Sequence, residues 1–241
     1  MKLDSGGATD QQEQEEIFDK DCPDFNYKLI LIGDSRAGKT SVTERYVNDA
    51  FDEKQKQTRT VQISRKMVKI DRTEKWAQLH IWDTLGQENF KSLAPLFYRK
   101  AVGAFLVFDL TSRKSFENID DWYQQVSSNV DGARVIVMLL GNKADLPNRE
   151  VSYNDAMEYA RSRNFGYLEV SAKTGTNIRN SFNCLVKEIY RAQVQEDPTT
   201  GNTIKPPGQP FKLLKEGDEN QPGQSEQEGP AKGKKKKECK C

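Results

Sequence analysis

The sequence predicts a three-layer α/β domain built on a six-stranded, mostly parallel sheet, with one antiparallel strand and about five helices. Short, nearly continuous apolar runs at 29–32, 102–110 and 135–140 have the pattern of strands that are covered on both faces. Amphipathic stretches alternate with these runs, as in a doubly wound domain. The segments 59–71 and 75–83 lie too close together for a crossover helix, so they are expected to pair as an antiparallel hairpin.

Three helices are indicated directly by the sequence. The first is expected over 39–48, after the first strand. The other two are marked by apolar side chains at helical spacing, namely Phe116, Ile119, Tyr123 and Val126, and then Ile178, Phe182, Leu185 and Ile189. Each of these follows a predicted strand, so they are placed to cover the faces of the sheet.

Composition divides the 241 residues into three parts. Residues 1–24 are acidic, rich in Gln and poor in apolar anchors, so we expect a disordered N-terminal extension. Residues 25–195 carry the α/β pattern and are expected to form one domain. Residues 196–241 hold six of the nine prolines and the lysine run at 234–237, so we expect a flexible tail that ends in a basic patch.

Charge and cysteine content exclude several classes of protein. The 37 basic and 36 acidic side chains nearly cancel, so no overall field favours nucleic acid, and no nucleic-acid partner is expected. The N-terminus does not resemble a signal peptide, and no apolar run approaches the ~20 residues that span a bilayer. The four cysteines have neither disulfide-framework nor zinc spacing, which indicates a reduced, cytosolic compartment.

Residues 33–40 read Gly-Asp-Ser-Arg-Ala-Gly-Lys-Thr and match a phosphate-binding loop between a strand and a helix. In such a loop, backbone N–H groups wrap the phosphates at a helix N-terminus. Lys39 is expected to reach the β- and γ-phosphates and to act in catalysis, and the Thr40 hydroxyl is expected to ligate Mg²⁺. The predicted nucleotide contacts of this segment are Gly33, Ser35, Arg36, Ala37, Gly38, Lys39, Thr40 and Ser41.

Asp83 ends a predicted strand, where a carboxylate can support Mg²⁺. The residues after it, Thr-Leu-Gly-Gln, strengthen this assignment. Gly86 could bring its backbone N–H to the γ-phosphate, and Gln87 could orient an attacking water, which makes Gln87 the second candidate catalytic residue.

The base pocket is predicted from two short segments that follow strands. In Asn142-Lys143-Ala144-Asp145, the Asp145 carboxylate can accept hydrogen bonds from guanine N1–H and from the 2-amino group. Adenine lacks both donors at these positions, so Asp145 argues against an ATPase or a kinase. Ser171-Ala172-Lys173 would complete the pocket through backbone N–H groups and stacking of the lysine.

The order and spacing of these four elements resemble the guanine-nucleotide-binding set of the Ras superfamily over about residues 25–195. Within the superfamily the chain is most similar to the Rab family, in the segments Gln78–Trp82, Phe97–Ala101 and Leu106–Thr111. The resemblance implies a Ras-like P-loop fold and a small GTPase that switches between GTP and GDP with Mg²⁺. Hydrolysis should be slow without an activating partner, because no arginine finger is evident in cis.

The Rab resemblance also implies a role in vesicle trafficking. It implies an exchange factor, a GTPase activator, effectors, a prenylation escort and a dissociation inhibitor as partners. Cys239 and Cys241 form a Cys-x-Cys end typical of attachment of two geranylgeranyl groups, and 211–214 resembles the apolar patch that the escort binds. The protein is therefore expected at the cytoplasmic face of an intracellular membrane, cycling with the cytosol, and the lysine run would favour anionic lipid.

One threonine and two departures from the Rab pattern need comment. The threonine that senses the γ-phosphate and Mg²⁺ is Thr60 by the hairpin register and Thr58 by counting from the phosphate loop, and we favour Thr60. Arg36 replaces a usual glycine, and Leu85 replaces a usual alanine before Gly86. The alternative to a working switch is therefore a poorly hydrolysing, nucleotide-locked scaffold.

Overall fold

The computed structural model describes residues 22–55, 58, 60–84, 97–130 and 135–196. All of them belong to one compact unit, Met1–Phe211, and the second unit, Lys212–Cys241, lies outside the described residues. The sheet has the strand order β2-β3-β1-β4-β5-β6, and only the β2–β3 pair is antiparallel. The strands are β1 (Phe25–Ile32), β2 (Gln62–Lys69), β3 (Trp76–Asp83), β4 (Gly103–Asp109), β5 (Ile136–Asn142) and β6 (Gly166–Glu169). The predicted fold class is confirmed.

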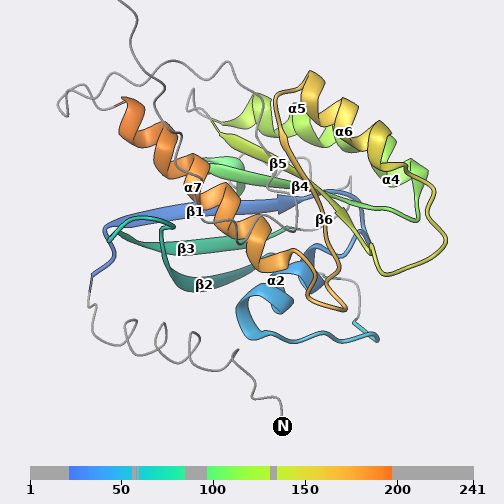
Figure 1. Ribbon diagram of the computed structural model, residues 1–241, viewed down its shortest axis with the longest axis horizontal. Coiled ribbons are helices and arrows are strands. Elements are labelled where there is room, and N and C mark those ends of the chain that lie inside the picture. Colours follow the sequence, from blue (N-terminus) through green and yellow to red (C-terminus); the bar gives the residue numbers. More distant parts are fainter. Residues whose placement is uncertain (1–21, 56–57, 59, 85–96, 131–134, 197–241) are drawn as a thin grey trace, which may run out of the picture. The chain divides into compact units, whose positions relative to one another are not determined.

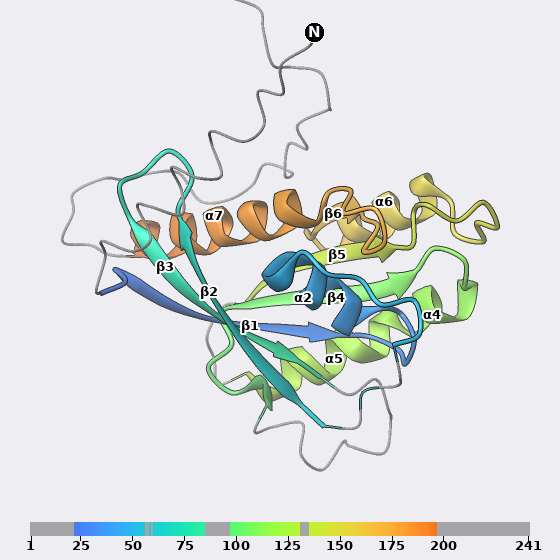
Figure 2. The same ribbon diagram turned by 90° about the horizontal axis from the view of Figure 1, so that it is seen from below.

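Helices cover both faces of the sheet (Figures 1 and 2). Those of the described residues are α2 (Lys39–Asn48), α4 (Arg113–Glu117), α5 (Ile119–Asn129), α6 (Tyr153–Ser162) and α7 (Ile178–Glu196). Side chains of α2 and α7 join one apolar cluster, and those of α4, α5 and α6 join another. The sheet therefore separates two cores, as the apolar runs of its central strands predict.

The first core is built around aromatic rings from three elements. Tyr46 of α2 stacks on Phe182 of α7, with 3.7 Å between the ring centroids. Phe105 of β4 lies 4.7 Å from Phe182 at a tilted angle. Phe182 is fully buried, so it joins both helices to the central strand.

The helix predicted around 116–126 is divided in two. Ser112 caps α4 by accepting a hydrogen bond from the Ser115 N–H, and Asn118 ends α4 and precedes α5. The Asn118 side chain makes no cap; it donates to the Asp34 Oδ2 in the phosphate loop, at 2.7 Å. The division thus places an amide against a loop that is distant in the sequence.

Candidate functional site

The candidate site lies at the edge of the sheet where the parallel strands β1, β4 and β5 end, the position at which open α/β sheets bind ligands. A pocket of about 650 Å³ opens there. Most of the predicted contacts line it, from three separate segments: Ser35, Arg36, Gly38, Lys39, Thr40, Ser41, Asn142, Lys143, Asp145, Ala172 and Lys173. Sequence motifs that lie about 100 residues apart therefore meet around one cavity.

Two glycines give the phosphate loop its close approach to other elements. A Cβ on Gly33 would lie 2.0 Å from the Val107 carbonyl oxygen, and a Cβ on Gly38 would lie 2.2 Å from the Asn142 Nδ2. Gly38 also has a φ of 94°, in the left-handed region. It precedes α2 without a side-chain cap, and the first residues of the helix line the pocket, so their backbone N–H groups are suited to bind an anion.

Lys39, the first residue of α2, lies at the end of the phosphate loop and is 5% exposed. Its Nζ donates to the backbone oxygens of Gly33 at 2.8 Å and of Asp34 at 2.9 Å. Burial lowers the pKa of Lys39 to about 8, and the charges of Asp83 and Asp34 offset only part of this shift. An incoming phosphate would supply the compensating negative charge.

Three oxygens converge beside Lys39. The Thr40 hydroxyl donates to the Asp83 Oδ2 at 2.5 Å and lies 2.6 Å from the Thr58 hydroxyl. The other carboxylate oxygen, Oδ1 of Asp83, is buried without a hydrogen-bond partner, and burial raises the pKa of this carboxyl above its usual value. An unpaired buried carboxylate beside two hydroxyls fits a hard divalent cation such as Mg²⁺.

The structure brings Thr58, not Thr60, to this point. Thr58 lines the pocket, whereas Thr60 is exposed and is not among the lining residues. The β2–β3 ladder begins with Gln62 opposite Asp83, so the chain before Gln62 no longer follows the hairpin register. Counting from that register therefore selected Thr60, and the geometry favours the residue selected by counting from the phosphate loop.

Asn142 connects the phosphate loop to the segment 171–173. Its Nδ2 donates to the Ala37 carbonyl at 2.9 Å, and its Oδ1 accepts from the Ala172 N–H at 3.2 Å. The side chain is 2% exposed, so both bonds are shielded from water. Gly33, Ala37 and Ser171 do not line the pocket themselves, but each is hydrogen-bonded to a residue that does, namely Lys39, Asn142 and Asp145, respectively.

Asp145, the predicted base-reading residue, is held by a hydrogen bond at the edge of the pocket. Its Oδ1 accepts from the Ser171 hydroxyl at 2.6 Å, and Asp145 itself is exposed and lines the pocket. Next to it, the Lys143 Nζ contacts the Asp109 Oδ2 at 2.5 Å. The Lys173 Nζ pairs with Glu53 at 2.5 Å, a partner that the sequence did not suggest.

Two further residues of the site escaped the sequence analysis. The Asp34 carboxylate accepts from the Trp122 Nε1 and the Asn118 Nδ2, each at 2.7 Å, and so anchors the phosphate loop to α5. The Arg45 guanidinium donates to the carbonyls of Ala172 and Lys173, each at 2.9 Å. A polar residue inside the loop motif was a usable signal for Asp34, whereas nothing local marks Arg45.

Some predictions lie outside the described residues. They concern Leu85, Gly86 and Gln87 after β3, and Cys239 and Cys241 at the C-terminus. They stay predictions. Among the described residues, no helix is both long and apolar enough to cross a membrane.

Comparison with known proteins shows the family to which the chain belongs. The model of the Ras family matches residues 28–191. Ras-related protein RABA4b of Arabidopsis thaliana is 37% identical over 201 residues, which is 83% of this chain and 82% of the relative. Ras-related protein RABA1g of the same plant is 37% identical over 77% of this chain and 86% of its own. Ras-related protein Rab11B of Nicotiana tabacum is 35% identical over 77% of this chain and 88% of its own.

Proposed function

The chain belongs to the Ras family as a Rab-type small GTPase, and on that premise we propose that it is a GTP/GDP switch in vesicle trafficking that recruits effectors to membranes. It hydrolyses GTP to GDP and phosphate, as its family does. The observation that carries the proposal is the convergence of Thr40, Thr58 and Asp83 on one point beside Lys39.

This convergence connects the nucleotide to the segment around Thr58. Thr40 belongs to the fixed phosphate loop, Asp83 ends β3, and Thr58 lies in the connection between α2 and β2. Bound Mg²⁺ would neutralise phosphate charge at this point, held by the two hydroxyls and the carboxylate. A nucleotide that retains its γ-phosphate would keep Thr58 in place, and its loss would release Thr58.

The other residues act by binding and orientation. Lys39 neutralises the β- and γ-phosphates, and the α2 N-terminus supplies backbone donors. Asp145, oriented by Ser171, accepts from the guanine edge, so the site would select GTP over ATP. Gln87 would orient the attacking water, and the slow reaction would be accelerated by a GTPase activator.

The test is single-turnover release of phosphate from radiolabelled GTP, beside a Gln87→Leu variant. We expect slow release that falls further in the variant. ATP should not compete at comparable concentration, because adenine offers Asp145 neither of the two guanine donors. Effective competition by ATP would overturn the base assignment.

Membrane attachment belongs to the same proposal. Two geranylgeranyl groups at Cys239 and Cys241 would anchor the protein stably, with the lysine run at 234–237 adding attraction to anionic lipid. The protein would then cycle between the cytosol and the cytoplasmic face of an organelle, through an escort, a dissociation inhibitor and an exchange factor. Mass spectrometry of protein from eukaryotic cells should show both additions, and unmodified cysteines would contradict this.

One observation favours the second candidate function, a nucleotide-locked scaffold. Arg36 lines the pocket with a φ of 67°, a left-handed conformation that a glycine would adopt without strain. A cation held there would strengthen nucleotide binding. Hydrolysis at background rate, with and without candidate activators, would support the scaffold.

A further inference from the structure

One end of the sheet carries an open face on the side opposite α2 and α7. In the β2–β3 register, Ile63 lies opposite Trp82 and Arg65 opposite His80. These side chains point away from the first core, to which Leu79 and Ile81 of the same strand belong. Ile63 is 51% exposed and Arg65 is exposed, so this part of the sheet has no complete cover. We call the β1–β3–β2 surface on this side the open face.

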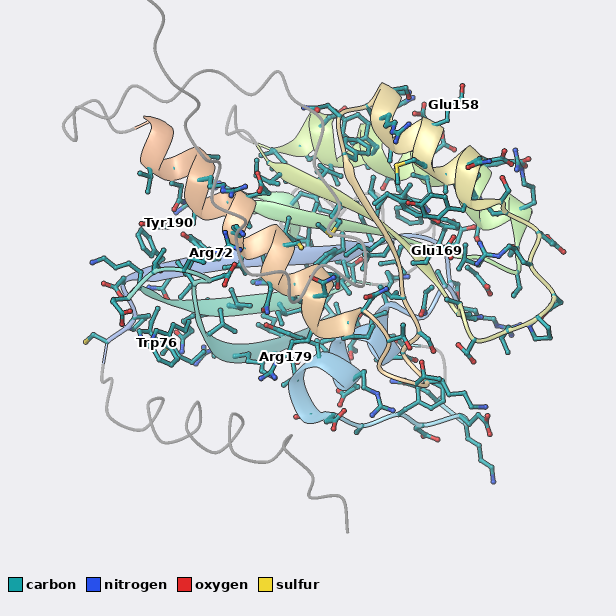
Figure 3. The ribbon with its side chains drawn as sticks, viewed as in Figure 1. Arg72, Trp76, Glu158, Glu169, Arg179 and Tyr190 are labelled. Atoms are coloured by element: carbon teal, nitrogen blue, oxygen red, sulfur yellow. The ribbon has the colours of Figure 1, made fainter. Side chains whose placement is uncertain are left out.

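Trp76 lies on the same face but is only 5% exposed. It begins β3, opposite Lys69, and Figure 3 shows it at the end of the sheet where β1 starts. Its neighbours on this face are the polar Lys69 and Gln78 and the half-buried Met67, and Lys69 is itself exposed. Trp76 belongs to neither apolar cluster of the described residues. A large aromatic ring is therefore buried beside strands whose described side chains on this face are mostly polar.

The N-terminal segment enters the domain beside this ring. The Asp24 Oδ2 accepts from the Trp76 N–H at 2.8 Å, and the Asp24 N–H donates to the Trp76 carbonyl at 2.9 Å. The Lys75 Nζ pairs with the same carboxylate at 3.0 Å. Residue 21 therefore precedes, by only three positions, a residue that is hydrogen-bonded directly to the Trp76 backbone.

The composition of residues 1–21 complements the open face. The segment has seven acidic and two basic side chains, and Ile17-Phe18 is its only pair of adjacent large apolar residues. The face carries Arg65, for which no ion pair is found among the described residues, and Lys28, whose Nζ lies 3.9 Å above the Trp82 ring. An acidic segment with one apolar pair suits a surface that carries cations beside the half-buried ring of Trp82.

The segment is also long enough. From Trp76 to Trp82 the face measures about 20 Å along β3. Residues 11–21 would span about 16 Å as a helix and up to about 36 Å when extended. Either form covers Trp76 and reaches the cations at the centre of the face.

We propose that residues 1–21 of the chain dock on the open face, with Ile17-Phe18 against Trp76 and the acidic side chains toward Arg65 and Lys28. The docked segment covers part of the surface next to Trp82 and Phe97, whose ring centroids lie 6.3 Å apart. It therefore competes with any effector that binds these rings. The competition rests on the proposed switch function, whereas the docking itself does not.

The test measures acrylamide quenching of Trp76 fluorescence in the full-length protein. The Trp76 signal of each variant is obtained by subtracting the fluorescence of the same variant with the additional substitution Trp76→Phe. The test variant is Ile17→Ser with Phe18→Ser, and Leu3→Ser is the control in the same segment. We expect quenching of Trp76 to rise severalfold in the test variant and to stay unchanged in the control. High salt should act in the same direction in the unmodified protein.

Three results would overturn the proposal. The first is a Trp76 that stays protected in the test variant and in a chain without residues 1–21, because the domain itself would then cover the ring. The second is protection that depends on protein concentration, which would identify a second copy as the cover. The third is quenching of Trp76 that rises as much in the Leu3→Ser control as in the test variant. GTP binding is measured on the same samples. If the unmodified protein does not bind GTP, the switch function is refuted, whereas the docking result is unaffected.

Discussion

Thr58→Ala and Thr60→Ala form a matched pair that tests how the switch is built. The Thr58 hydroxyl lies 2.6 Å from the Thr40 hydroxyl in the pocket, whereas Thr60 is exposed. Removing the Thr58 hydroxyl should weaken retention of GTP and Mg²⁺, and removing that of Thr60 should have little effect. Both substitutions delete the same atoms from the same connection, so differences in helix or strand propensity do not confuse the comparison.

The magnitude follows from one lost polar contact. A typical hydrogen bond contributes about 0.5–1.5 kcal/mol net, which corresponds to about a 2- to 12-fold faster release of GTP. A bond to a charged partner contributes about 1.5–3 kcal/mol, so with Mg²⁺ bound the effect should lie at or above the upper end of that range. The Thr60 variant should stay within about twofold, as an exposed substitution does.

The assay is the release rate of a fluorescent GTP analogue over a series of Mg²⁺ concentrations, with the GDP analogue as the reference. The Thr58 variant should release GTP faster and need more Mg²⁺, while its release of GDP changes less, because in the proposed switch the γ-phosphate helps to keep Thr58 in place. The reverse order of the two variants would refute the placement of Thr58. Equal effects on GTP and GDP would refute the link to the γ-phosphate.

Four further results are expected. Gly38→Ala should weaken GTP binding by about 5- to 150-fold, because its Cβ would meet Asn142 at 2.2 Å with a φ of 94°, and titration calorimetry would show whether binding instead survives. Phe182→Ala should lower the free energy of unfolding by about 3–5 kcal/mol in urea, and a loss under 1 kcal/mol would contradict its central packing. Lys39 loses its charge as the pH rises above its pKa of about 8, so GTP affinity should then fall. Binding of GTP at pH 9 should be accompanied by uptake of a proton, which calorimetry in buffers of different ionisation enthalpy detects. Binding without proton uptake would contradict a lowered pKa of Lys39. Arg36→Gly should stabilise the nucleotide-free protein by about 1 kcal/mol through relief of its left-handed backbone, and an unchanged or lower melting temperature would argue against strain.

The parts of the site that sequence analysis found are contiguous motifs beside strands. The phosphate loop could be predicted because its glycines, Lys39 and Thr40 follow one another at the end of an apolar run. Asp83 and Asn142 could be placed because parallel strands end at the same edge of the sheet. The fold class followed from the same alternation of apolar runs and amphipathic stretches.

The parts of the site that sequence analysis did not find depend on tertiary contacts. Asn118 interrupts a helical pattern that is otherwise continuous, and its amide bonds to Asp34, 84 residues away. Arg45 fixes carbonyls 127 and 128 residues distant. Thr58 lies in a connection without periodicity, where two ways of counting gave two answers. Local patterns contain no information about such partners.

The position of Asn142 has a consequence for how the ligand leaves. A single buried amide supports the loop that surrounds the phosphates and the loop that faces the base. A disturbance that rotates this amide should loosen both loops together, so we expect the base and the phosphates to leave in one cooperative event. A partner that catalyses nucleotide release could therefore act from either end of the pocket with the same result.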